Sequence, residues 1–121
     1  MTKNIYERFE NLTGHPVTIL HTDGKIAKRI GVSGRFAPLR LKTFYKDLGK
    51  IHGVPVNTLR YGLETPLSEL RRLEKLDIIV SLVTAKELHR LGYQGRMFVP
   101  CGKHIGRYGV KGCTALSLYN R

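Results

Sequence analysis

The sequence predicts an α+β domain with a mainly antiparallel sheet of about six strands and two or three short helices. Two observations carry this prediction. Stretches of alternating apolar and polar residues are separated by glycine-containing turns, which is typical of hairpins, and two short segments carry leucines at helical spacing. With 121 residues, of which 41% are hydrophobic, the chain fits one domain, residues 1–121, with a modest core.

The N-terminal third is expected to contain a short helical turn, a hairpin and a third strand. Residues 5–10 favour the helical turn. Residues 16–21 are rich in β-branched side chains, alternation resumes over 25–30, and the Asp-Gly pair between them is a hairpin signal. Over residues 36–44 the alternation predicts a strand with Arg40 and Lys42 on its outer face.

The remaining elements follow from spacing and from residues that end helices. The sequence gives no clear prediction over residues 44–53, and residues 54–62 read as a strand that lies at an edge near Pro55. A leucine every third residue predicts a short helix over 66–76. The most apolar run, 77–83, predicts a buried strand, followed by a helix over 84–91 that ends at Gly92. Residues 96–100 and 114–119 are expected to be the closing strands.

Between these closing strands, four glycines alternate with basic residues (Gly102, Lys103, His104, Gly106, Arg107, Gly109, Lys111 and Gly112). Glycine lets a backbone approach a phosphate closely, so one interpretation is a loop that binds an anion. The alternative is a solvated hairpin whose glycines serve only its turns, because no established phosphate-loop motif is present. The sequence leaves both interpretations open.

Charge narrows the class of ligand. The chain has 21 Lys and Arg residues against 9 Asp and Glu, a formal net charge of +12, which favours polyanions or phosphorylated ligands. No apolar run is long enough to span a bilayer and the N-terminus lacks the apolar core of a signal peptide, so we expect a cytoplasmic protein. In that compartment Cys101 and Cys113 are expected to be reduced, and a disulfide between them is the alternative.

The pattern of histidines and carboxylates argues against catalysis. The five histidines are scattered, without a metal-binding or acid/base motif, and neither cysteine has zinc-ligand spacing. We therefore expect no catalytic residues, no metal and no cofactor.

Several short motifs resemble those of a family of small phage proteins. They are Asn11-Leu12-Thr13-Gly14-His15, Val54-Pro55-Val56 with Tyr61-Gly62, Ile79-Val80-Ser81, and Val99-Pro100-Cys101-Gly102. On these residues the chain resembles the first family of Thoeris anti-defence proteins, with a departure at Cys101, where that family's pattern has glycine after proline. The resemblance extends over most of residues 11–118.

The resemblance implies a homo-oligomer that sequesters cyclic nucleotide-type immune signals, glycocyclic ADP-ribose and possibly cyclic oligonucleotides, without cleaving them. Such a protein needs guanidinium groups for phosphates and aromatic rings that stack on a base. Pairs of this kind that lie close in sequence, with further basic and hydroxyl residues, make up the predicted ligand-binding set: Arg29, Arg60, Tyr61, Ser81, Arg96, Phe98, Lys103, Arg107 and Tyr108. Each pair has a plain alternative, an exposed arginine beside a core aromatic residue.

Direct binding of nucleic acid is the second functional hypothesis. A net charge of +12 on a small sheet suits contacts with a phosphate backbone, although no helix-turn-helix motif or RNA-binding aromatic strand is present. The salt dependence of binding distinguishes the two hypotheses, because duplex binding weakens steeply with salt.

Overall fold

The structure of the protein, a computed structural model, describes residues 8–119. In chain order the elements are β1 (Phe9–Asn11), β2 (Val17–Leu20), β3 (Ile26–Ile30), β4 (Leu41–Ile51), β5 (Val54–Leu63), α1 (Leu67–Leu73), β6 (Asp77–Ile79), α2 (Leu82–Arg90), β7 (Met97–Ile105), a short 3₁₀ turn (Arg107–Gly109) and β8 (Lys111–Leu118). The predicted α+β class, with a largely antiparallel sheet, is confirmed.

Six strands form one strongly curved, nearly barrel-shaped sheet in the order β1-β6-β7-β8-β2-β3. The hairpins β2–β3 and β7–β8 are antiparallel, whereas β1 with β6, β6 with β7, and β2 with β8 pair in parallel. The parallel pairings were not predicted. Helix α2 connects β6 to β7, and a helical crossover of this kind brings the next strand back in the same direction.

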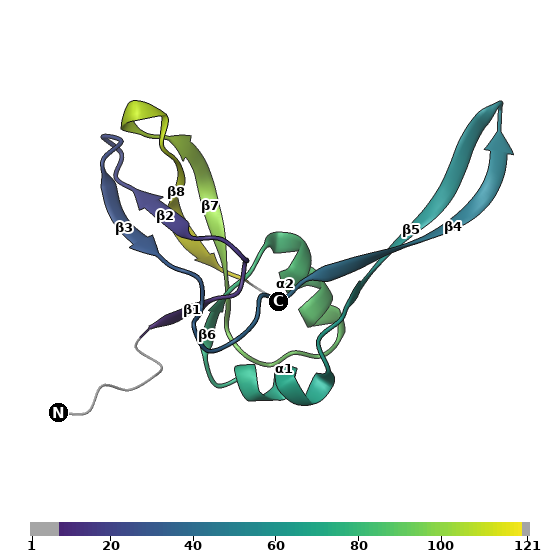
Figure 1. Ribbon diagram of the computed structural model, residues 1–121, viewed down its shortest axis with the longest axis horizontal. Helices are drawn as coiled ribbons and strands as arrows, with labels where there is room; N and C mark the ends of the chain where they lie inside the picture. The colour runs from purple at the N-terminus through teal and green to yellow at the C-terminus, as the bar shows by residue number, and fades with distance from the viewer. Residues whose placement is uncertain (1–7, 120–121) are drawn as a thin grey trace.

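The other two strands, β4 and β5, form a long separate hairpin, here called the arm (Figure 1). Its register runs from Leu41 opposite Leu63 to Ile51 opposite Val54. The prediction over 36–44 placed the start of this strand too early, and the unassigned residues 44–51 belong to β4. His52 and Gly53, with φ of 51° and 79°, join the strands in a turn that needs two left-handed residues, as type I′ turns do.

Both helices occur close to where they were predicted. In α1 the predicted leucine stripe is buried at Leu70 and Leu73, but Leu67 is exposed. Helix α2 begins two residues earlier than predicted because Ser81 caps it, its side chain accepting a hydrogen bond from the Thr84 N–H at 3.3 Å. The predicted strand 77–83 therefore ends at Ile79. Gly92 follows α2 with φ of +84°, as expected for a residue that ends a helix.

Two apolar clusters hold the described residues together. The larger one packs both helices against the sheet and contains Leu12, Leu39, Leu70, Leu73, Leu76, Ile78, Val80, Ala85, Leu88, Tyr93 and Met97. The smaller one lies on the curved sheet around Val17, Ile79 and Cys113, with Phe9 and Phe98 packed edge to face at 5.0 Å. The arm contributes Leu63, at its root, to the periphery of the larger cluster.

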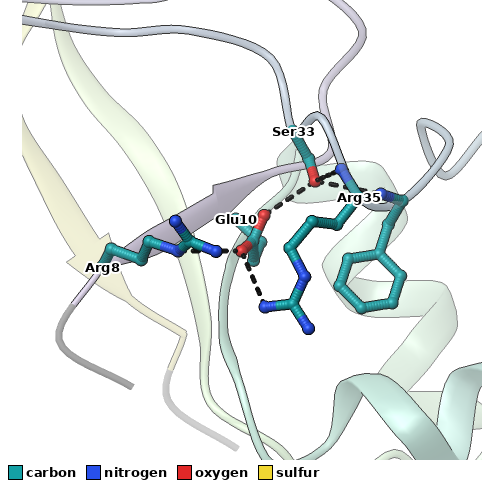
Figure 2. A network of polar contacts seen from close by, with 5 residues as sticks. Arg8, Glu10, Ser33 and Arg35 are labelled. Atoms are coloured by element: carbon teal, nitrogen blue, oxygen red, sulfur yellow. Dashed lines mark hydrogen bonds and ion pairs between the residues drawn. The ribbon is translucent and has the colours of Figure 1, made fainter. Parts of the chain in front are cut away.

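The predicted helical turn over residues 5–10 is wrong where it can be checked. Residues 5–7 lie outside the described residues, and Phe9 and Glu10 belong to β1, where pairing with β6 replaces a local helix. Figure 2 shows the polar contacts that hold this strand in place. The buried Glu10 carboxylate accepts a hydrogen bond from Ser33 Oγ at 2.7 Å and lies 3.3 Å from Arg8 Nε and 3.7 Å from Arg35 Nη1.

The glycine-rich segment is mostly strand. β7 continues to Ile105 and β8 begins at Lys111, so only residues 106–110 connect them. The segment is therefore a hairpin with a short connection, and anion binding by its basic residues stays a prediction. Cys101 and Cys113 are both free thiols, and burial raises the pKa of Cys113.

Candidate functional site

A cavity of about 630 Å³ lies between the root of the arm and helix α2. Strand β5 and its partner β4 form one wall and the C-terminal half of α2 forms the other. The lining residues are Phe44, Leu59, Arg60, Tyr61, Gly62, Leu63, Glu87, Arg90 and Leu91. Pockets that bind small organic ligands have this size and this mixture of aromatic, aliphatic and charged side chains.

Phe44 is held in this wall by its neighbours on the hairpin. Arg60 lies directly opposite Phe44 in the register, with its guanidinium carbon 5.3 Å from the ring centroid, and Lys42 Nζ lies 5.7 Å from the same centroid. A Cβ at Gly62 would lie only 3.2 Å from the Phe44 ring. Glycine at position 62 therefore leaves room for the ring, and the ring in turn positions two cations.

The opposite wall carries an ion pair. Arg90 Nε donates to both Glu87 oxygens at 3.1 Å, and Arg90 Nη2 donates to Oε1 as well. These hydrogen bonds and the charges of Arg90 and Arg60 lower the pKa of Glu87 despite its partial burial, and the pKa of Arg90 is raised. With two arginines and one carboxylate, the lining has a formal charge of +1.

This arrangement suits an anionic ligand that has an aromatic part. Guanidinium groups on facing walls can bind phosphate oxygens with two parallel hydrogen bonds each. The exposed rings of Phe44 and Tyr61 offer surfaces for stacking, the second interaction that holds nucleobases.

Only two of the nine predicted ligand-binding residues, Arg60 and Tyr61, line this cavity. Arg96 is engaged elsewhere: its Nε and Nη2 each donate to Asp77 at 2.8 Å, and its guanidinium lies 5.5 Å from the Phe98 ring. Phe98 itself packs against the smaller core cluster. For Arg96 and Phe98 the plain alternative, an exposed arginine beside a core aromatic residue, describes the structure better.

Ser81 and Arg29 also lie apart from the cavity lining. The Ser81 side chain caps α2 and donates to Thr84 Oγ1 at 2.9 Å. Arg29 is exposed on β3, opposite Thr18. Ser81 is therefore the N-cap residue of α2.

The three predicted residues of the glycine-rich segment lie on the β7–β8 hairpin. Lys103 lines a second, shallower cavity of about 910 Å³, here called the sheet groove, whose walls are His15, Pro16, Val17, Thr18, Pro100, Lys103, His104, Ile105, Lys111, Gly112 and Cys113. Arg107 Nε donates to the Asp23 carbonyl at 3.3 Å. Tyr108 is fully exposed with φ of 60°. These residues do not converge with Arg60 and Tyr61 on one site.

The motif around Asn11 has a structural role. Asn11 is buried, its amide donates to the carbonyls of His15 and Ile30 at 2.9 and 3.1 Å, and its Oδ1 accepts from the Thr13 N–H at 3.0 Å. The Asn-Leu-Thr-Gly-His segment therefore forms a side-chain-stabilised turn that joins β1 to the end of β3.

Sequence reasoning missed Phe44, Glu87 and Arg90. Phe44 lies at the start of the segment left unassigned, although Lys42, Phe44 and Lys46 continue the alternation seen before it. Glu87 and Arg90 are one helical turn apart on α2, a spacing that reads as an ordinary surface ion pair. Glu87 and Arg90 lie opposite β5 because of the direction in which the arm extends from the rest of the chain. No local sequence pattern predicts that direction.

Two further findings concern the part of the chain that the structure describes. Within residues 8–119 no group of three or more His, Cys, Asp or Glu side chains is placed to hold a metal ion, and no helix is long and apolar enough to cross a membrane.

Comparison of the chain with models of known protein families, with curated proteins and with solved structures finds no match.

Proposed function

We propose that this protein binds an anionic, nucleotide-type ligand in the cavity at the root of the arm and holds it without chemical change. The ligand class follows from the resemblance noted above: glycocyclic ADP-ribose, and possibly cyclic oligonucleotides. In this proposal the protein is a homo-oligomeric phage product that removes a defence signal in the cytoplasm of a bacterial host.

The observation that carries the proposal is the position of Arg60. Its guanidinium carbon lies 5.3 Å from the centroid of the Phe44 ring, and Arg60 lines a cavity of about 630 Å³ together with Glu87 and Arg90. One residue thus joins the aromatic wall of the cavity to its charged wall. A ligand that has a phosphate beside a base would contact both walls at once.

Calorimetric titration with glycocyclic ADP-ribose and with cyclic di- and trinucleotides tests the proposal, followed by chromatography of the recovered ligand. We expect binding of at least one of these ligands and its return intact. Arg60→Gln should weaken that binding about 10- to 100-fold, because one charge-assisted hydrogen bond contributes about 1.5–3 kcal/mol.

A matched control is Arg72→Gln, which removes an exposed arginine of α1 that does not line the cavity. It should leave the affinity unchanged. Equal losses of affinity in both variants would mean that only the net charge of the protein matters for binding. Recovery of a cleaved ligand would mean that the protein is an enzyme.

Nucleic-acid binding is the second candidate, and one observation favours it. Lys42, Lys46 and Arg60 share one face of the arm, as their pairing with Gly62, Thr58 and Phe44 requires. A two-stranded ribbon is narrow enough to enter the major groove of DNA. Titration with a random duplex at several salt concentrations tests this candidate, because log K should fall with log salt by about 0.9 per phosphate contacted.

A further inference from the structure

The sheet groove has a buried floor, which forms where β8 approaches β2. Val17, Thr18 and Cys113 line the groove and are between 4% and 7% exposed. A Cβ at Gly112 would lie 2.6 Å from the Thr18 carbonyl oxygen, so glycine lets the two strands come this close. Val17 and Cys113 belong to the smaller apolar cluster, and the packing of that cluster holds the floor in place.

The floor and the walls beside it are apolar. The Cys113 thiol donates to the Thr18 carbonyl at 3.7 Å, and burial raises the pKa of Cys113, so this thiol stays protonated and uncharged. Pro16 and Pro100 line the groove without a backbone N–H. Ile105, which is 67% exposed, adds an aliphatic side chain. This surface suits the apolar part of a ligand.

The charges of the groove are all of one sign. Lys103 lies opposite Cys113 and Lys111 lies opposite Ile105, so the two lysines are diagonal neighbours on one face of the β7–β8 hairpin. Diagonal neighbours are about 7–8 Å apart, and two ammonium groups at that separation repel each other. No Asp or Glu lines the groove, and within residues 8–119 neither lysine is ion-paired. A bound anion between the two lysines would offset their repulsion.

The groove differs in chemistry from the cavity at the root of the arm. No arginine, Phe or Tyr lines the groove, whereas all three line the other cavity, and the two share no residue. The groove therefore lacks the two interactions that hold nucleotides, bidentate guanidinium contacts and stacking on an aromatic ring. The hairpins that carry the groove also extend in a different direction from the arm (Figure 1).

We propose that the sheet groove is a second binding site, for a free amphipathic anion whose acyl chain ends in a carboxylate. The acyl chain lies on the floor formed by Val17 and Cys113, and the carboxylate lies between Lys103 and Lys111. A pocket of mostly apolar lining with a few polar groups that fix the orientation of the ligand is typical of small-molecule sites. The proposal does not depend on the ligand of the other cavity.

Two-dimensional NMR titration of the isotopically labelled full chain with decanoate tests the proposal. We expect saturable binding with a dissociation constant below about 1 mM, and amide shifts concentrated at residues 17–18, 103–105 and 111–113. Octanoate should bind about 5- to 10-fold more weakly, because it buries two fewer CH₂ groups. Absence of saturable binding, or shifts concentrated at the root of the arm, would overturn the proposal. Equal affinity for decyltrimethylammonium, which has the same chain and the opposite charge, would also overturn it.

Variants of the lysines test the position of the carboxylate. Lys103→Gln and Lys111→Gln should each weaken decanoate binding about 5-fold and leave the binding of uncharged decanol nearly unchanged. Lys75→Gln is the matched control, because it removes an exposed lysine that lines neither cavity. Equal losses in all three variants would mean that decanoate responds only to net charge, which would contradict the proposed site.

A variant of the aliphatic wall tests the position of the chain. Ile105→Ser should weaken decanoate and decanol alike, by about 5-fold. The matched control is Ile26→Ser, which changes a 50% exposed isoleucine outside the groove and should change neither affinity. Equal effects of the two serine variants would exclude the groove as the site. Circular dichroism verifies that the variants are folded, and calorimetry with nucleotide-type ligands reports on the other cavity separately.

Discussion

The backbone N–H of Arg107 donates to the carbonyl oxygen of Gly24 at 3.1 Å, across 83 positions of sequence. This bond fastens the connection of the β7–β8 hairpin to the turn of the β2–β3 hairpin, and the Arg107 side chain adds a second bond to the Asp23 carbonyl. Arg107 was predicted to bind an anion. In the structure it holds two hairpin tips together at the far end of the curved sheet.

The close approach of these tips makes Gly106 sensitive to substitution. A Cβ at position 106 would lie 2.6 Å from the Gly24 carbonyl oxygen and 3.2 Å from the Leu20 methyl groups. Gly106→Ala should lower the free energy of unfolding by about 1–3 kcal/mol, as overpacking does elsewhere. Urea unfolding measures the change. In the control, Gly31→Ala, the new methyl group meets nothing within 4 Å, and an equal loss there would contradict the explanation.

Asn11 should be the most sensitive polar residue of the β1–β2 connection. Truncation to alanine removes every hydrogen bond of its buried side chain and leaves the carbonyls of His15 and Ile30 without that donor. We expect Asn11→Ala to lower the free energy of unfolding by about 2–4 kcal/mol, the sum of several lost buried partners. The exposed Asn57 of the arm is the control. Similar urea midpoints for the two alanine variants would argue against this role.

Glu10 connects β1 to the loop that precedes the arm. Its carboxylate is buried, and Ser33 Oγ, which donates to it, accepts the N–H groups of Arg35 and Phe36 at 3.1 Å (Figure 2). Glu10→Ala should destabilise the protein by about 1–3 kcal/mol because it removes a buried acceptor from this network. Thermal unfolding of Glu10→Ala beside Glu64→Ala, which changes an exposed carboxylate, measures the effect. No difference between them would contradict it.

The β2–β3 hairpin was among the most predictable parts of the fold. The Asp23-Gly24 signal placed the β2–β3 turn correctly, since its geometry depends on residues adjacent in sequence. The arm's turn at His52-Gly53 escaped prediction because histidine seldom occupies a left-handed position. The parallel pairing of β1 with β6 joins residues 68 positions apart, and no periodicity within either strand reports it.

The candidate site was less predictable for the same physical reason. Arg60 and Tyr61 were selected because they are adjacent, but adjacent residues of a strand point to opposite faces. A site is assembled from facing elements instead, and here Glu87 and Arg90 come from α2. The pairs Arg96 with Phe98, two positions apart, and Arg107 with Tyr108 were selected for the same closeness in sequence and lie elsewhere, so closeness in sequence alone does not bring residues into one site.

Glu87 should limit the affinity of the cavity for anions, because its carboxylate already occupies the Arg90 guanidinium. Glu87→Gln leaves the size of the side chain nearly unchanged and removes the competing charge. We therefore expect tighter binding of the nucleotide-type ligand, by about 3- to 10-fold at low salt, as calorimetry would measure. Glu69→Gln changes an acidic residue of α1 outside the cavity and should have a much smaller effect.

The pH dependence of binding follows from the same pair. Arg90, as donor and as charge, lowers the pKa of Glu87 below its ordinary value of 4.5, so the ionised carboxylate stabilises the folded state above that pH and loses this effect as the pH falls through the lowered pKa. Protonation of Glu87 releases Arg90, whereas a phosphodiester ligand stays ionised. Affinity should therefore rise as the pH falls through the lowered pKa of Glu87 in the wild-type protein, and this rise should be absent in Glu87→Gln. The same rise in both proteins would assign the pH dependence to another group.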